Sequence, residues 1–218
     1  TGDSVINKSI EISNAKSLNN AKMSFVFRGN RYLAERDNGR FVLARFMVSE
    51  TKDSIFDVLS NDGFERFVND EQIMLPDSLM AKFSASVNSV HYFSVLPYGL
   101  NDKAVFKTLL GEESIKQQNY FKVLVTFSEE GGGEDFEDEF VYWINSETFK
   151  IEYLAYSYAE DDGQGLRFRE AYNERMISGI RIVDYSNYKP TKEDVPLESL
   201  GLLFNNDNLE LLSKIELE

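Results

Sequence analysis

Acidic, glycine-rich turns are the segments of this 218-residue chain whose residue types most clearly suggest chemistry. One turn contains Glu134 and Asp135, and a second contains Asp161 and Asp162. Carboxylate oxygens are the ligands that Ca²⁺ prefers, and glycine lets a backbone fold around an ion. The pattern therefore predicts a calcium site at these four acids, and no other cofactor. The alternative is two solvated hairpin loops whose charge opposes aggregation.

His91 is the only histidine. A catalytic triad or any other site that needs histidine must therefore use it. It lies on the apolar face of a helix predicted over residues 76–92. One interpretation is a buried histidine that donates a single hydrogen bond. The other is a residue that contacts a ligand or transfers a proton.

Arg167 and Arg169 alternate with Leu166 and Phe168 along a predicted strand. Alternate residues of a strand point to opposite faces of a sheet, so one face must hold both arginines. On a concave face they would bind the carboxylate or phosphate of a ligand. On a convex face they would pair with neighbouring acids across the strands.

Aromatic side chains recur at period two through the predicted strands. Such rings form a sheet core, or line a cavity that accepts a lipid or another apolar molecule. We take the following aromatic residues as the candidate ligand-binding wall: Phe25, Phe27, Tyr98, Trp143, Tyr156 and Phe168.

The composition excludes several classes of function. The net charge is −14, with 23 basic and 37 acidic residues, whereas a nucleic-acid-binding protein needs a basic surface. The chain has no cysteine, which excludes disulfides, thiolate catalysis and cysteine zinc sites. The acidity is typical of a soluble, monomeric protein.

The elements that must position these residues are mainly strands. Alternating apolar residues predict strands around Phe25, Tyr32, residues 41–48 and residues 55–59. Asn38 and Gly39 predict a tight hairpin between two of them. Longer strands in series predict an antiparallel meander over residues 120–127, 136–144, 149–158, 166–177 and 180–188.

Helical patterns occur in two places. Asp3 or Ser4 caps a short N-terminal helix. Residues 76–110 form a helical insertion, with one helix that starts at Pro76 and a second predicted from Asp102 to Leu110, where Gly111 would end it. Pro190 and Pro196 mark an extended tail that we expect to fold back, because the leucines between residues 200 and 212 need covering.

These elements predict an α+β, mainly β fold in a single domain over residues 1–218. The sheet is antiparallel, open and strongly curved, a half-barrel with the helical insertion covering its concave face. The chain starts at Thr1, which suggests a mature form whose leader has been removed.

Several sequence motifs together resemble an uncharacterised family of secreted or lipid-anchored envelope proteins of Gram-negative bacteria. They are FVFRG (25–29), SVLPYGLND (94–102), VTFSEEGGGEDFED (125–138), YLAYSY (153–158), RFREAYN (167–173) and VDYSNYKP (183–190). The resemblance implies a periplasmic or outer-membrane-anchored location. It implies no catalytic residue.

The order of strands and helices is also similar to the fold of the outer-membrane lipoprotein carrier. That fold is an open curved sheet of about eleven strands with helices on its concave face. We therefore expect a binding protein, without catalysis, that holds a lipid, a lipoprotein or another apolar or amphipathic ligand. The alternatives are a structural protein that binds an envelope partner through its acidic loops, and a carboxylate-based hydrolase.

Overall fold

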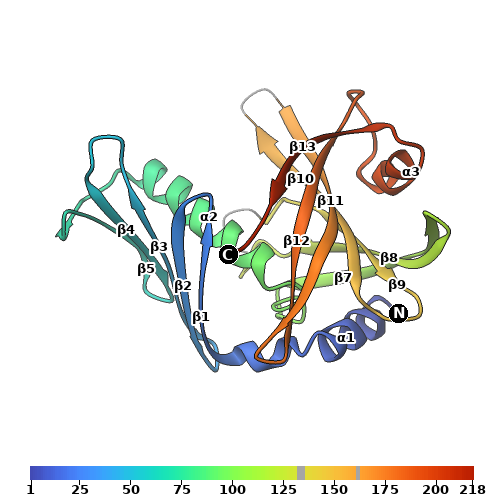
Figure 1. The fold of residues 1–218 in the computed structure, drawn as a ribbon, viewed down its shortest axis with the longest axis horizontal. Helices are drawn as coiled ribbons and strands as arrows, with labels where there is room; N and C mark the ends of the chain where they lie inside the picture. The colour runs from blue at the N-terminus through green and yellow to red at the C-terminus, as the bar shows by residue number, and fades with distance from the viewer. Residues whose placement is uncertain (132–135, 161–162) are drawn as a thin grey trace. The chain divides into compact units, whose positions relative to one another are not determined.

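The computed structural model of the chain describes residues 1–131, 136–160 and 163–218. The chain forms two compact units (Figure 1). The seven-stranded unit comprises Thr1–Ala15 and Gly99–Ile215, and the six-stranded unit comprises Lys16–Tyr98 and Glu216–Glu218. The chain therefore passes between the units three times.

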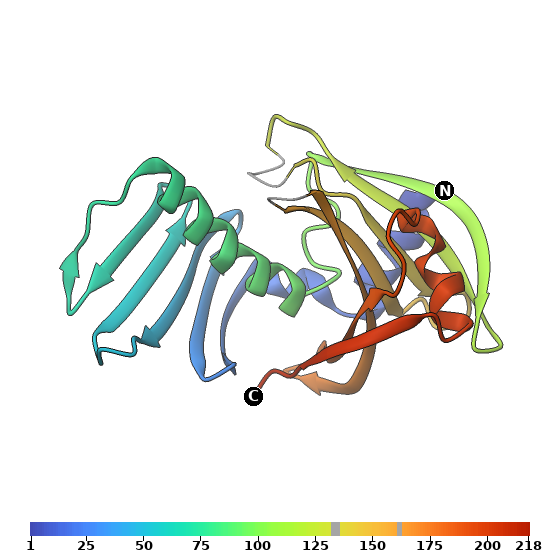
Figure 2. The same cartoon turned by 90° about the horizontal axis from the view of Figure 1, so that it is seen from above.

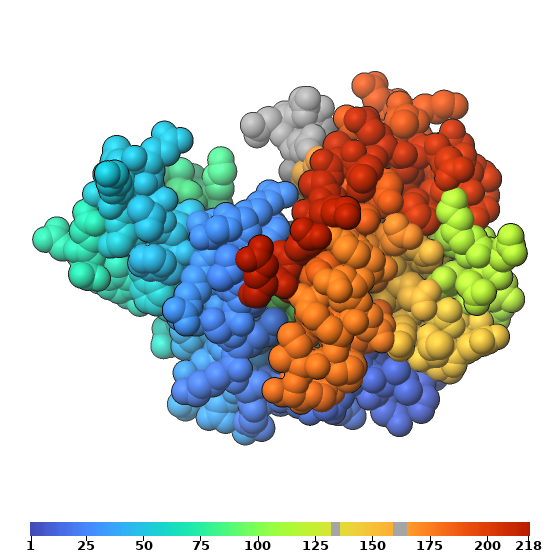
Figure 3. Space-filling view, viewed as in Figure 1, coloured from blue at the N-terminus to red at the C-terminus, as the bar shows by residue number. Residues whose placement is uncertain are grey.

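The seven-stranded unit is an antiparallel meander closed by a strand from the C-terminal segment, and its sheet is strongly curved (Figure 2). In the space-filling view, β12 and β13 lie side by side (Figure 3). Along the sheet, the strands of the described chain are β13 (Leu209–Ile215), β12 (Ile180–Pro190), β11 (Gly163–Ile177), β10 (Ile151–Glu160), β9 (Phe140–Asn145), β8 (Gln118–Phe127) and β7 (Val105–Ile115).

Both faces of the central strands in this unit are buried. Trp143 of β9 and Phe168 of β11 belong to one core cluster, together with Leu200 and Phe204 of helix α3 (Leu200–Asn205). The short 3₁₀ helix η2 (Leu197–Ser199) leads into α3 and contributes Leu197 to the same cluster. Helix α1 (Gly2–Ile12) packs against β7 and β8 through its apolar residues.

The six-stranded unit is a run of hairpins with one helix packed on it. Within the described chain its strands are β1 (Asn20–Phe27), β2 (Asn30–Asp37), β3 (Arg40–Val48), β4 (Ser54–Ser60), β5 (Gly63–Val68) and β6 (Glu71–Gln72). Helix α2 (Asp77–Ser94) lies against β3, β4 and β5. We call the sheet face that α2 covers the inner face, and the opposite face the outer face.

Side-chain alternation assigns residues to these two faces. Ala34 and Leu43 are cross-strand partners that cluster with Val87 of α2, so they belong to the inner face. Residues two positions away on the same strands, such as Arg36 and Arg45, share this face. Neighbouring residues in between point to the outer face.

The predicted fold class is confirmed. The chain is mainly antiparallel β, with a short N-terminal helix and a helix inserted between two runs of strands. The strands are divided between two sheets. The Asn38–Gly39 hairpin is also confirmed, since both residues have the positive φ (48° and 93°) that this turn requires.

The predicted second helix, from Asp102 to Leu110, is wrong. Residues from Val105 onward form β7, which pairs with β8. Gly111 ends no helix; it lies beside a shift of register in that pairing, with φ of +125°, a β-bulge position that favours glycine. Local spacing suggested a helix, but pairing along the length of β8 satisfies the backbone better.

Candidate ligand-binding site

The structure separates the predicted wall residues into groups that lie in different places. Phe25, Phe27, His91 and Tyr98 belong to the six-stranded unit. The remaining described candidates belong to the seven-stranded unit: Trp143, Tyr156, Arg167, Phe168 and Arg169. The predicted calcium ligands, Glu134, Asp135, Asp161 and Asp162, lie outside the described residues. Among the described residues, no group of three or more acidic or histidine side chains lies close enough together to hold a metal ion.

Trp143 and Phe168 occupy a closed core. Both side chains are 0% exposed. Their ring centroids lie 5.5 Å apart, and the Phe168 ring stacks on Phe204 of α3 at 4.8 Å. Helix α3 therefore covers these rings. The predicted fold-back of this tail is confirmed, since Leu200 and Phe204 pack into the core cluster and cover these rings.

Tyr156 and Arg169 lie on the other face of the same sheet. Arg169 donates a hydrogen bond from Nη2 to the Tyr156 hydroxyl at 2.8 Å. Its guanidinium lies 5.0 Å from the Tyr156 ring and 5.9 Å from the Tyr185 ring. Burial lowers the pKa of Arg169, and these tyrosines partly offset that effect. Arg167, on the same face, lies over the Tyr158 ring at 5.0 Å.

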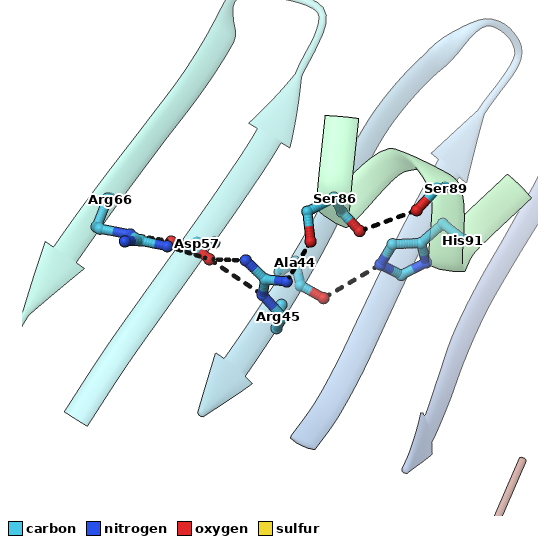
Figure 4. A network of polar contacts seen from close by, with 7 residues as sticks. All are labelled: Ala44, Arg45, Asp57, Arg66, Ser86, Ser89 and His91. Carbon is cyan, nitrogen blue, oxygen red and sulfur yellow. Dashed lines mark hydrogen bonds and ion pairs between the residues drawn. The ribbon is translucent and has the colours of Figure 1, made fainter. Parts of the chain in front are cut away.

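The inner face of the six-stranded sheet brings His91 against two aromatic rings. The imidazole meets Phe25 and Tyr32 edge to face, at centroid distances of 5.7 and 5.6 Å. Its Nε2 atom lies 3.2 Å from the Ala44 carbonyl oxygen, which accepts the hydrogen bond (Figure 4). Burial is the main reason that the pKa of His91 falls to about 4, with a smaller lowering by Arg36.

Arg36 is a candidate site residue that the sequence pattern did not reveal. It is buried on the inner face, and its guanidinium lies 5.2 Å from the centroid of the Tyr98 ring. Burial lowers its pKa, while Tyr98 acts in the opposite direction. The sequence could have indicated it, because Arg36 lies two and four residues after Ala34 and Tyr32 on β2, so all three side chains point to the same face of the sheet. A charged residue in an apolar row of a strand indicates a polar role.

Polar contacts hold α2 to the sheet (Figure 4). Asp57 is fully buried between Arg45 and Arg66, with nitrogen-to-oxygen distances of 2.7 and 2.6 Å. Arg45 also donates to the Ser86 hydroxyl on α2 at 2.9 Å. The Arg66 guanidinium lies 3.5 Å from the centroid of the Phe83 ring, on the same helix. Charged groups of the sheet therefore make several of the close contacts with α2.

The apolar layer between α2 and the inner face is thin. Of the eighteen residues of α2, only Val87, His91 and Ser94 are buried. The core cluster there contains three buried residues, Ala34, Leu43 and Val87. The apolar side chains around them are only partly buried: Met23, Phe41, Leu59 and Phe64. An apolar surface that the protein covers incompletely is a candidate ligand-binding surface.

A family of unknown function (DUF6503) matches residues 5–217. The chain belongs to this family. Comparison with the curated proteins gives no match. The predicted membership in an uncharacterised family is thereby confirmed.

Solved structures share the fold of this DUF6503 protein. A LolA superfamily protein from Nitrosomonas europaea has a TM-score of 0.54 and 14% identity, over 88% of this chain and 87% of that chain. The similarity confirms the predicted resemblance to the lipoprotein carrier fold, and at this identity it establishes the fold alone.

Two further structures have lower TM-scores. A DUF1329 family protein from Desulfovibrio piger gives 0.43 at 12% identity, over 86% of each chain. A putative outer membrane lipoprotein-sorting protein domain from Vibrio parahaemolyticus gives 0.41 at 10% identity, over 84% of this chain and 86% of that chain. Within the described residues of the DUF6503 chain, no helix is both long and apolar enough to cross a membrane.

Proposed function

We propose that this protein binds an apolar or amphipathic ligand, such as a lipid or the acyl chain of a lipoprotein, between α2 and the inner face of the six-stranded sheet. The protein acts as a carrier without catalysis, as a monomer of one domain, in the Gram-negative cell envelope. The LolA-like fold supports this class of function.

The observation that carries the proposal is the thin layer under α2. An eighteen-residue helix that buried a full apolar stripe would contribute about eight to ten core residues, whereas α2 buries Val87, His91 and Ser94. The partly buried side chains beneath it include Leu59 and Phe64. An apolar chain inserted there would complete the layer, because it would remove these side chains from water.

The experiment compares the two faces of one sheet. Phe64→Lys places a charge in the layer under α2, and Phe46→Lys places the same charge on the outer face, where Phe46 is 39% exposed. The probe is the fluorescent apolar compound N-phenyl-1-naphthylamine, and native mass spectrometry of protein from an envelope fraction detects bound lipid.

We expect Phe64→Lys to weaken probe binding about tenfold or more, because a desolvated ammonium disfavours an apolar neighbour. Phe46→Lys should leave it unchanged. Equal binding by both variants, or no binding by the unmodified protein, would reject the site. Circular dichroism of both variants checks that they remain folded.

A second candidate function is docking of an envelope protein, and the outer face favours it. Val42, Phe46 and Val48 of β3 are 44%, 39% and 61% exposed, and all point to that face. Exposed apolar patches of this kind mark interaction surfaces. Crosslinking in envelope extracts tests this function: Phe46→Lys should remove a crosslinked partner that Phe64→Lys retains. The reverse result would exclude it.

A further inference from the structure

Two buried polar side chains on the inner side of the six-stranded unit lack hydrogen-bond partners. Arg36 of β2 is 7% exposed and His91 of α2 is 1% exposed. Neither the Nη1 atom of Arg36 nor the Nδ1 atom of His91 has a hydrogen-bond partner among the described residues. Buried polar atoms in proteins nearly always form hydrogen bonds, so we expect a further group to bind these two atoms.

The chemistry of these atoms restricts the partner. A carbonyl oxygen only accepts hydrogen bonds, so the contact between His91 Nε2 and the Ala44 carbonyl places the proton on Nε2. The neutral imidazole then presents Nδ1 as an acceptor. Arg36 Nη1 is a donor. The partner must therefore accept from Arg36 and donate to His91, as a water molecule or a carboxyl group does.

The charge of Arg36 favours the carboxyl group over water. In the described structure Arg36 forms no ion pair, and its close partner is the Tyr98 ring. A buried guanidinium is costly unless an anion neutralises it. Water provides no negative charge. A phosphate would bring up to two charges and more acceptor oxygens than these two groups satisfy, whereas a carboxylate has one charge and two oxygens.

We propose that Arg36 and His91 together bind the carboxylate of a long-chain fatty acid or a similar amphipathic acid, whose apolar chain lies between α2 and the inner face. This inference rests on the proposed function and specifies its ligand class. One carboxylate oxygen accepts from Arg36 Nη1. The other oxygen faces His91 Nδ1. Binding of the ionised ligand takes up one proton from solvent, and this oxygen and Nδ1 share that proton.

The shared proton can be detected through the pKa of His91, because few charged side chains surround the imidazole. The charged and titratable side chains that the structure places against it are Arg36 and Tyr32 from β2. Arg45, on the neighbouring strand, is bound to Asp57. A carboxylate at Nδ1 adds a negative charge that none of these residues provides. Ligand binding should therefore raise the pKa of His91 from about 4 by at least about one unit.

The experiment compares palmitate with 1-hexadecanol, which has the same chain without the acid. Because His91 is the only histidine, a single imidazole proton resonance in the NMR spectrum reports its titration. Arg36→Met removes the cation and keeps an apolar side chain of similar length. Arg31→Met is the matched control, since Arg31 lies on the same strand, exposed and on the outer face. Arg36→Gln serves if Arg36→Met unfolds.

We expect palmitate to bind about tenfold more tightly than 1-hexadecanol, and to shift the His91 titration upward, because an ion pair adds to the apolar contacts. Arg36→Met should abolish both effects and retain 1-hexadecanol binding, whereas Arg31→Met should change neither. Equal binding of the two compounds, with no shift of His91, would overturn this inference and leave the proposed function standing. Binding of neither compound would overturn both.

Discussion

The two units bury their sheets in different ways. In the seven-stranded unit, ten buried residues form one core cluster, which includes Trp143 and Phe168 beneath α3. In the six-stranded unit, the cluster beneath α2 has three buried residues, and polar contacts and aromatic contacts of His91 add to it. A dense aromatic core gives rigidity, whereas a thin layer held by polar groups leaves room for exchange with a ligand.

The difference suggests a division of labour. Under the proposed function, the six-stranded unit would hold the ligand and the seven-stranded unit would serve as a scaffold. Sequence composition alone does not distinguish them, because both contain aromatic strands. What distinguishes them is the covering helix: α3 contributes Leu200 and Phe204 to a core, and α2 contributes mainly half-exposed residues.

The largest effect should come from the buried ion pairs of the six-stranded unit. Asp57→Asn leaves Arg45 and Arg66 buried without a negative charge between them. We expect a loss of about 3–5 kcal/mol in the free energy of unfolding, measured by urea denaturation. Asp62→Asn, at an exposed turn, is the control and should cost under about 0.5 kcal/mol. A cost for Asp57→Asn as small as the control's would mean that polar contacts do not hold this unit together.

Truncation of one phenylalanine in each unit compares the two cores directly. Phe168→Ala should lower the free energy of unfolding by about 4 kcal/mol, because it leaves a cavity in a closed cluster. Phe64→Ala, at the partly buried edge of the thin layer, should cost about half as much. Equal costs in urea denaturation would remove the proposed contrast.

The same denaturation curves test the proposal of a single domain. Because the chain passes between the units three times, we expect both to unfold in one transition. Separate transitions for Phe168→Ala and Phe64→Ala, seen by different probes, would instead indicate two independently folding units.

The pH dependence of stability should depend on His91. Its pKa is about 4 in the folded protein and 6.5 in the reference state, so below pH 6.5 the unfolded chain takes up a proton that the folded chain excludes. Stability is therefore lost as the pH falls from 6.5 towards 4, by about 3 kcal/mol from this residue. His91→Gln, which cannot titrate, should lack this component when both proteins are unfolded at pH 7 and pH 4. Parallel pH profiles would contradict it.

The smallest effect concerns the fit of α3 on the dense core. A Cβ atom at Gly201 would lie 2.6 Å from Glu113 Oε1 and 2.7 Å from the Trp143 ring. We expect Gly201→Ala to lower the free energy of unfolding by about 1–2 kcal/mol, because the closely packed core has no space for the added methyl group. Leu202→Ala, an exposed neighbour on α3, should be nearly neutral. A neutral Gly201→Ala would show that α3 is loosely packed, which would make the two units alike. The melting temperature by differential scanning calorimetry measures both.

The strands and the inserted helix could be predicted from sequence because their patterns are local. The alternation of apolar residues along β10 to β12 and the Asn38–Gly39 turn depend only on residues that are close in the sequence. The helix predicted from Asp102 was wrong because the conformation of that segment depends on pairing with β8, which is not a local property of the sequence.

The site itself was harder to predict. Arg45, Asp57 and Arg66 come from three strands, and only the register of those strands brings them together. Arg36 and His91 lie far apart in the sequence, and the packing of α2 brings the imidazole within electrostatic range of the guanidinium. Trp143 and Phe168, two of the predicted wall residues, lie in a closed core beneath α3.

The small number of buried residues on α2 has a consequence for temperature. The heat capacity change of a transition scales with the apolar surface that it exposes. Detachment of α2 exposes little such surface, since Val87 is its only fully buried aliphatic side chain among the described residues. The free energy of that opening should therefore vary almost linearly with temperature, without the curvature of global unfolding. Cold should not open the layer under α2, and a ligand should find it equally accessible across the growth range of the cell.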